Sequence, residues 1–119
     1  QQVLSLKPNP EVLQGLDIGV VGPRGKVGVL GAHPLGDALF EVRAFFPTQQ
    51  GLAEDPVTGS LNAALGQWLI GDGLAPEHYV ASQGTALGRA GRVHVSRDHQ
   101  QQVWVAGDSV VCVQGQVLL

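Results

Sequence analysis

The run Glu54-Asp55-Pro56-Val57-Thr58-Gly59-Ser60 holds the residues of this sequence that are best placed for chemistry. It is polar and turn-prone, and it leads directly into an apolar segment. Thr58 and Ser60 are both favoured N-cap residues, and Gly59 lets the backbone approach a ligand closely. Because the first N–H groups of a helix are free and carry the positive end of its dipole, such a start can bind an anion. The alternative is that Thr58 and Ser60 only cap the helix, and the composition of the run by itself favours capping.

Asp55 is the candidate catalytic carboxylate. It is either a residue of a binding cleft or a turn residue that accepts local N–H groups before Pro56, and we favour the cleft. A nearby helix start stabilises the ionised carboxylate, which suits orienting a partner histidine better than donating a proton. Glu54 points elsewhere if the segment is extended, so we interpret it as solvated or structural. No second carboxylate of the sequence forms a convincing acid–base pair with Asp55.

The residues after Ser60 predict a short helix that must position this site. Leu61, Leu65, Trp68 and Leu69 fall on one helical face, and the other faces are apolar except for two residues. About eleven residues, or roughly 16 Å, separate the start from the Gly71-Asp72-Gly73 exit. A helix that is apolar nearly all round is expected to be enclosed by other elements.

The rest of the chain reads mainly as short strands. Val-rich or alternating segments predict strands at 3–6, 17–22, 27–32, 38–46, 78–83, 92–97, 103–105 and 109–113, with 116–119 closing the chain. Asn9 and Pro10 predict the start of a minor helix that ends at Gly15. Pro47 is expected to end the strand 38–46, and residues 48–57 to form a loop. This pattern predicts one α+β domain over residues 1–119, an antiparallel β-roll or barrel wrapped around one central apolar helix.

Composition narrows the classes of partner. The net charge is −3 with no basic run, which argues against nucleic acid, and no apolar run is long enough to span a bilayer. The only cysteine, Cys112, excludes an internal disulfide and fits a reducing, cytoplasmic compartment, and its alternating apolar surroundings predict a packed thiol. The four histidines show no spacing typical of a metal site. The chain has no methionine and begins with glutamine, so we expect a fragment of a longer product.

Three further features allow two interpretations each. Arg43 lies beside Glu41 on its strand and is either part of an internal ion pair or a cleft residue, and the prediction we favour is a surface pair with Glu41. The segment from Gln83-Gly84 to Gly88-Arg89 is either a structural turn or a wall of the cleft, and we favour the turn. Trp104 should face outward from its strand, either as ordinary surface or as a contact with a second domain.

Several of these motifs together resemble the C-terminal half of the PhzF family, the phenazine-biosynthesis isomerase-like proteins. They are Arg43-Ala44-Phe45-Phe46-Pro47, the run from Glu54 to Ser60, Gln83-Gly84 with Gly88-Arg89, and a final Val-rich meander with Gly107 before Val110. The similarity covers essentially this whole chain and about half of a typical member. One departure stands directly after the run: many members have Ala-His where this chain has Leu61-Asn62.

The resemblance implies a fold shared with diaminopimelate epimerase, in which two similar halves each form a β-roll around a central helix. The active site would lie between the halves, with both helix starts facing it. The family implies no cofactor and a hydrogen moved on a small carboxylate-bearing substrate. A glutamate and a helper histidine come from the N-terminal half, which this chain lacks. The resemblance places Asp55 in the cleft and the substrate carboxylate at Thr58, Gly59 and Ser60.

Two classes of function follow. The first, which we favour, is an enzyme: the C-terminal half of a PhzF-like isomerase that needs a complementary N-terminal half, in the same parent chain or as another chain. The second is a stand-alone, non-catalytic half-domain that pairs with a second copy of itself and binds a small anion or acts as an interaction module. A third hypothesis is that two copies mimic the full cleft, so that two helix starts face one ligand.

Overall fold

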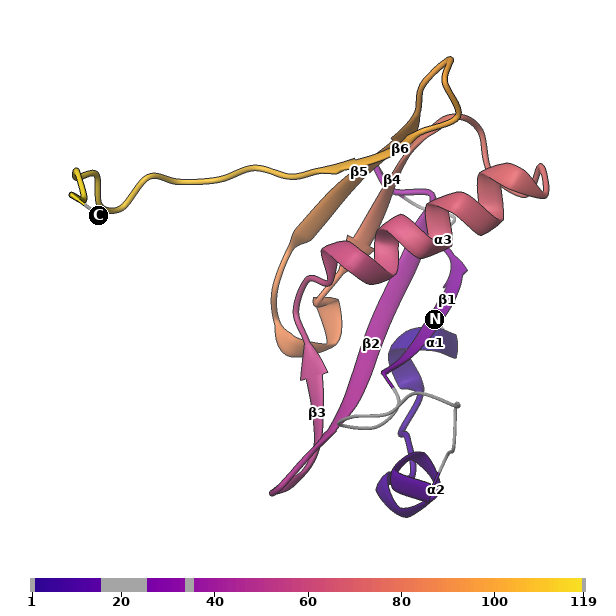
Figure 1. Cartoon of the computed structure of the whole chain (residues 1–119). Coiled ribbons are helices and arrows are strands. Elements are labelled where there is room, and N and C mark those ends of the chain that lie inside the picture. The colour runs from indigo at the N-terminus through magenta and orange to yellow at the C-terminus, as the bar shows by residue number, and fades with distance from the viewer. Residues whose placement is uncertain (1, 16–25, 34–35, 119) are drawn as a thin grey trace.

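The computed structural model of the chain describes residues 2–15, 26–33 and 36–118 (Figure 1). The predicted strand 17–22 lies outside them. The elements are α1 (Gln2–Ser5), α2 (Pro10–Gly15), β1 (Val27–Ala32), β2 (Phe40–Thr48), β3 (Gly51–Asp55), α3 (Gly59–Gly71), β4 (His78–Gln83), the 3₁₀ turn η1 (Thr85–Leu87), β5 (Gly91–Arg97) and β6 (Val103–Ala106). The chain is therefore of the α+β class, as predicted.

The six strands of the described residues form one mixed sheet. Its main path runs β1-β2-β4-β5-β6, and β3 pairs with the far end of β2. Every pairing is antiparallel except that of β2 with β4, where Phe40 lies opposite Ala81 and Val42 opposite Gln83. The predicted antiparallel meander is thus present twice, in β1-β2-β3 and in β4-β5-β6, and the parallel pairing of β2 with β4 joins the two. The chain crosses over through α3 between β3 and β4, and such a crossover is what parallel neighbours require.

Helix α3 lies along one face of the sheet (Figure 1). Its inner side packs on apolar residues of four strands to form the core, which comprises Val42, Leu65, Leu69, Ile70, Tyr79, Ala81, Val93, Val95 and Val103. Gly66 makes this approach close, because a Cβ on it would come within 2.7 Å of Val95 Cγ1. The outer side is not covered in the described part of the chain, and Trp68 is 50% exposed. The expectation that other elements enclose the helix is therefore not met by these residues.

The predicted start of α2 and the predicted end of α3 are right. Asn9 Oδ1 accepts from the backbone N–H groups of Glu11 and Val12 at 2.9 and 3.3 Å, which caps α2 as expected. Helix α3 ends at Gly71, and the N–H of Leu74 returns to the carbonyl of Leu69 at 2.8 Å. Gly73 at φ +70° allows this turn. No helix among the described residues is long and apolar enough to cross a membrane.

Three predictions for the N-terminal half of the chain are wrong, two about strands and one about a loop. Residues 3–6 are not a strand, since most of them belong to α1, which lies on the sheet face opposite α3. Strand β2 does not end before Pro47 but continues to Thr48. The described part of β1 reaches only Phe45, so Pro47 sits where β2 approaches an edge and a missing N–H is tolerated. The predicted loop 48–57 contains β3, which forms a hairpin with β2.

Arg43 fastens β2, β3 and the N-terminal segment together. Its guanidinium donates Nε and Nη2 to the two carboxylate oxygens of Glu54, both at 2.8 Å, and the two side chains are only 8% and 10% exposed. Nη1 donates to the carbonyls of Val3 and Leu6 at 3.0 and 2.8 Å. The hydrogen bonds to Glu54 raise the pKa of Arg43 above its already high value, so the guanidinium stays charged.

The predicted surface pair of Arg43 with Glu41 is therefore wrong. Glu41 is also buried, but its Oε2 accepts from the Thr85 hydroxyl at 3.2 Å and lies 3.8 Å from His33 Nε2. Of the two interpretations of Glu54, the structural one holds and the solvated one is wrong, because Glu54 is buried against Arg43.

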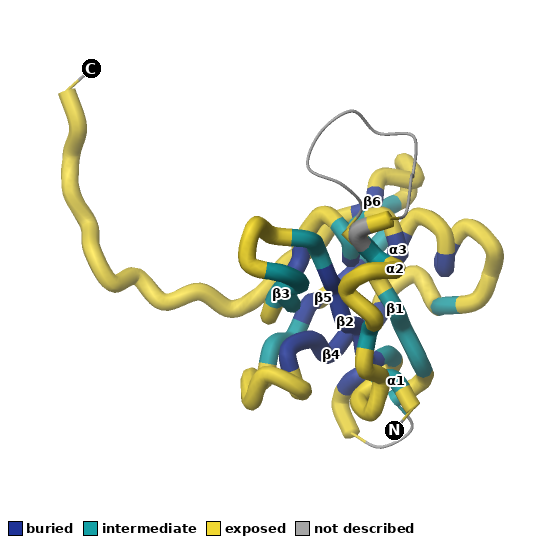
Figure 2. The backbone as a smooth tube through the Cα atoms, turned by 90° about the horizontal axis from the view of Figure 1, so that it is seen from below, coloured by how far each residue is buried: buried dark blue, intermediate teal, exposed yellow. Residues whose placement is uncertain are grey.

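The segment 107–118 has no regular secondary structure and extends away from the sheet, exposed along its length (Figures 1 and 2). The strand predicted at 109–113 is absent, and Val113 is 90% exposed. Cys112 is exposed as well, not packed as expected. An alternating sequence forms a strand only beside another strand. No described strand pairs with this segment, so its apolar side chains remain uncovered.

Gly66 and Gly71 provide a test of how closely α3 packs. Gly66→Ala should lower the free energy of unfolding by roughly 1–3 kcal/mol, because its Cβ would overlap Val95 and Val103. Gly71→Ala is the matched control, since no atom lies within 4 Å of its Cβ position. It should cause no loss and up to about 1 kcal/mol of gain from helix propensity. Urea denaturation of both variants measures this, and equal effects would contradict the close approach of α3 to β5.

The Arg43–Glu54 pair gives a second test. Arg43→Met leaves the Glu54 carboxylate buried without its partner and should cost roughly 3–5 kcal/mol of unfolding free energy. Arg97→Met is the control, because Arg97 pairs with Glu77 at 3.2 Å where Glu77 is 59% exposed. That exposed pair should contribute less than about 1 kcal/mol. Similar losses in the two variants would show that Arg43 does not fasten the strands as described.

Candidate active site at the start of helix α3

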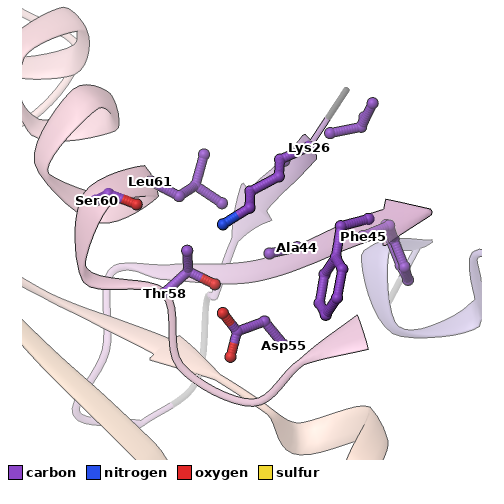
Figure 3. A pocket seen from close by; sticks show the side chains of 10 residues that line it. Lys26, Ala44, Phe45, Asp55, Thr58, Ser60 and Leu61 are labelled. Carbon is purple, nitrogen blue, oxygen red and sulfur yellow. The ribbon is translucent and has the colours of Figure 1, made fainter. Parts of the chain in front are cut away.

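A pocket of ≈170 Å³ opens where the start of α3 meets β1, β2 and the end of β3. Its lining contains an acid, a base, two hydroxyls and a set of apolar side chains (Figure 3). The lining residues are Lys26, Val27, Gly28, Ala44, Phe45, Phe46, Asp55, Thr58, Ser60 and Leu61. Three of the four predicted site residues, Asp55, Thr58 and Ser60, thus lie around one cavity, and Gly59 stands between two of them.

The start of α3 presents free donors beside this pocket. The first backbone hydrogen bond of the helix runs from the N–H of Asn62 to the carbonyl of Thr58 at 3.1 Å. The amides of Gly59, Ser60 and Leu61 therefore have no acceptor within the helix. No atom lies within 4 Å of the Cβ position of Gly59, so the backbone there is open to a ligand. This is the arrangement that the anion-binding interpretation requires.

Thr58 occupies the N-cap position, with extended φ −119° and ψ 97°, but its side chain makes no cap hydrogen bond. The capping role considered for its hydroxyl is therefore wrong. Thr58 is buried, and its Oγ1 accepts from Gln83 Nε2 at 3.0 Å. Ser60 is exposed at the pocket and lies inside the first turn of the helix, so it is not the cap either.

Asp55 is the last residue of β3 and lies opposite Ala44 of β2. Its carboxylate points into the pocket beside Thr58 (Figure 3). Oδ1 also accepts from the N–H of Val57 at 3.4 Å, which is a long hydrogen bond. Asp55 therefore both accepts a local turn hydrogen bond and lines the pocket. Its second carboxylate oxygen makes no hydrogen bond within the described chain.

Gln83 is a functional residue that the sequence does not identify. The sequence predicts it only as part of a structural turn. Its side chain is fully buried, and its amide contacts the site run directly. Nε2 donates to the carbonyl of Asp55 at 2.9 Å as well as to Thr58, and Oε1 accepts from the Thr58 N–H at 3.1 Å. Its position at the end of β4 carried no such signal, because the contacts span 25 and 28 residues.

Asn62 stands where the resemblance expects a histidine, and the structure places it under the helix. It is fully buried, and its Nδ2 donates to Gln83 Oε1 at 2.8 Å and to the Thr58 carbonyl at 2.9 Å. It does not line the pocket. Its side chain therefore acts on the loop geometry and not on a molecule in the pocket.

Lys26 is a second residue that sequence reasoning missed. It precedes β1 and lines the pocket opposite the start of α3, with its amine directed toward Thr58 and Leu61 (Figure 3). Its Nζ lies 6.0 Å from the centroid of the Phe46 ring. In the sequence it was only the last residue of a turn. The pairing of β1 with β2 is what brings it to the pocket.

The segment 84–90 is a turn around η1 and contributes no residue to this pocket. This is the structural interpretation that we favoured. Gly84, at φ +90°, is required there because a Cβ would come within 2.7 Å of the Pro56 carbonyl oxygen. No group of three or more metal-ligating side chains occurs among the described residues.

The site can thus bind a small molecule with an anionic end. The three free amides and the Lys26 ammonium offer positive potential at one side, and Val27, Phe45, Phe46 and Leu61 supply apolar walls. Its volume is below the roughly 300–1,000 Å³ typical of sites for drug-sized ligands, so the molecule should be small. Asp55 is placed to contact whatever lies between these groups.

Nearly the whole chain is similar to one family of known proteins. The family model of the phenazine biosynthesis-like proteins matches residues 2–115. An uncharacterized isomerase of Clostridium acetobutylicum is 32% identical over 123 residues, covering 96% of this chain and 40% of that protein. The uncharacterized isomerase YddE of Escherichia coli is 34% identical over 99 residues, covering 72% of this chain and 33% of that protein. No solved structure matches the chain.

The chain therefore spans about 40% of the length of the Clostridium relative, and less of the Escherichia one. The match to the family model covers nearly every residue, including both predicted motifs around β2 and α3. Both relatives are named isomerases, and their names specify no substrate. The chain belongs to the phenazine biosynthesis-like (PhzF) family.

Proposed function

We propose that this chain is the C-terminal half of a PhzF-like isomerase that moves a proton on a small carboxylate-bearing substrate without a cofactor. The start of α3 holds the substrate carboxylate through the amides of Gly59, Ser60 and Leu61. Asp55 contacts the substrate or orients an acid–base group of the complementary half. The observation that carries the proposal is that Ser60 and Leu61 of the first turn of α3, Lys26 and Asp55 line one small pocket.

The chemistry explains why such a pocket is useful. Removing a proton from the carbon next to a carboxylate builds up negative charge on the carboxylate oxygens. Hydrogen-bond donors that already point at those oxygens stabilise the charge without having to reorganise. Aligned amides at a helix start are donors of this kind, and the ammonium of Lys26 adds a full positive charge. Asp55 can orient a histidine but would not be the principal base.

The principal base would come from a complementary N-terminal half. The relatives are more than twice as long as the part that aligns with this chain, so they hold enough residues for such a half. The exposed outer side of α3 and the uncovered segment 107–118 are the surfaces that it would cover. We propose that the sheet becomes a roll around α3 when these surfaces are covered.

Binding can be tested first, because it does not require the second half. Titration of the ¹⁵N-labelled chain with acetate should shift the amide resonances of Gly59, Ser60 and Leu61 before any others. Lys26→Gln should weaken the binding by roughly 3- to 10-fold through loss of the ammonium. Lys7→Gln is the control, since Lys7 is exposed and does not line the pocket. Saturating acetate without a change at these three amides would refute the carboxylate site.

Catalysis is tested with the complementary half supplied, in the parent reading frame or as a separate chain. In deuterated water, small α-amino and α-hydroxy acids should exchange the hydrogen next to the carboxylate for deuterium, as measured by mass spectrometry. Asp55→Asn should slow the exchange by about 10²-fold or more if Asp55 acts in proton transfer or orients the acid–base group. Exchange that is unchanged in this variant would remove Asp55 from the mechanism.

The alternative proposal is a stand-alone half-domain that pairs with a second copy of itself. Trp68, on the outer side of α3, is 50% exposed, and Trp104 is 59% exposed on the face of β6 opposite the core residue Val103, so each offers a surface to a second copy. In the non-catalytic form the pair binds a small anion or serves as an interaction module. In the ligand-binding form, two copies bring two α3 starts to face one ligand.

Both forms are tested by the mass of the chain in solution. Sedimentation should show a dimer in either form, and Ser60→Ala should weaken carboxylate binding in the ligand-binding form. A monomer at all concentrations would exclude both forms.

A further inference from the structure

The side-chain amide of Gln83 uses all of its hydrogen-bonding capacity around the site run. Nε2 donates both hydrogens, one to the Asp55 carbonyl at 2.9 Å and one to Thr58 Oγ1 at 3.0 Å. Oε1 accepts twice, from the Thr58 N–H at 3.1 Å and from Asn62 Nδ2 at 2.8 Å. Exchanging the oxygen and the nitrogen of the amide would set donors against donors. The orientation of Gln83 is therefore fixed by its partners.

This orientation determines the role of the Thr58 hydroxyl. A hydroxyl has one hydrogen to donate and two lone pairs to accept with. Because Gln83 donates to Thr58 Oγ1, the hydroxyl hydrogen is not used in that contact, and it makes no bond within the residues that the structure describes. Thr58 is only 6% exposed, yet it lines the pocket, with its oxygen directed into the cavity (Figure 3). A buried donor without an acceptor is costly, so a ligand that accepts its hydrogen is favoured.

We propose that Gln83 is the positioning residue of the carboxylate site, because it makes Thr58 a hydrogen-bond donor to the ligand. Gln83 also holds the backbone on both sides of the turn, through the Asp55 carbonyl and the Thr58 N–H. The Thr58 hydroxyl and the free amides of the first turn of α3 then all act as hydrogen-bond donors to the ligand. The site consequently selects groups rich in lone pairs, such as carboxylates, over neutral amides of the same shape. This inference rests on the proposed function of the site.

Asn62 supports the same arrangement from below. Its Nδ2 gives one hydrogen to Gln83 Oε1 and the other to the Thr58 carbonyl. It thereby prevents Gln83 from turning its oxygen toward Thr58 Oγ1. Position 62 thus influences ligand selection only through Gln83 and not by contact with the ligand.

The test compares trifluoroacetate with trifluoroacetamide, which has a similar shape but no charge and offers donors. Trifluoroacetate stays ionised at any pH at which the chain is folded. Binding to the full chain is followed by ¹⁹F resonance and by the amides of residues 59–61. Wild type should bind the acid and not the amide. Thr58→Val should weaken trifluoroacetate binding about tenfold, whereas Thr58→Ser, which keeps the hydroxyl, should bind as wild type does.

Gln83→Glu tests the positioning itself. An ionised carboxylate cannot donate, so the Thr58 hydroxyl would turn and donate to residue 83, and binding should weaken about tenfold. As the pH falls, the buried glutamate becomes protonated and can donate again, so binding should recover. Gln67→Glu is the control for net charge, since Gln67 is exposed on the outer side of α3. It should bind as wild type does, with no such recovery at low pH.

The outcomes separate this inference from the proposed function. If wild type shows no perturbation at residues 59–61, the carboxylate site fails and the inference fails with it. If wild type binds but Thr58→Val and Gln83→Glu bind equally well, the site stands and the role of Gln83 is overturned. Should Gln83→Glu not fold, the side-chain amide protons of Gln83 in wild type decide the question. Both are hydrogen-bonded and should exchange slowly with water, and rapid exchange would overturn the inference.

Discussion

The buried amide of Gln83 is the interaction on which the site geometry depends. It joins the end of β4 to the turn between β3 and α3, two parts of the chain that are 25 or more residues apart. A buried amide is stabilising only when all its groups are paired, and here they are. The turn is thereby held in one conformation. Asp55 and the first-turn residues Ser60 and Leu61 line the same pocket for this reason.

The Arg43–Glu54 pair supports the turn from the other side. It ties β3 to β2 and to the N-terminal segment, on the sheet face opposite α3. Because β3 ends at Asp55, the ion pair fixes where the candidate carboxylate begins its approach to the pocket. Two buried polar groups, Arg43 below the sheet and Gln83 beside the helix, thus locate the ends of a run of only a few residues. Functional loops are usually positioned by a rigid scaffold in this way.

Two apolar surfaces of the described chain remain exposed. Helix α3 packs one side on the sheet and leaves the other exposed, and residues 107–118 carry apolar side chains that nothing in the described chain covers. The relatives of this family are much longer than the aligned part, and they are named isomerases. The candidate site lies at the start of α3, at the edge of these uncovered surfaces, and under the proposed function a complementary half would cover them.

The sequence by itself determined the α+β class, the helix from Ser60 to Gly71, the strand from His78 to Gln83 and the family, because these rest on local periodicity, turn residues and a specific motif. It also pointed to Asp55 and to the run from Thr58 to Ser60, since helix-start chemistry is local. Tertiary structure alone decided the partner of Arg43, the parallel pairing of β2 with β4, the contacts of Gln83 and the position of Lys26 at the pocket. Each of these depends on strand register between distant segments. Register is set by the packing of the whole sheet, which no local stretch of sequence specifies.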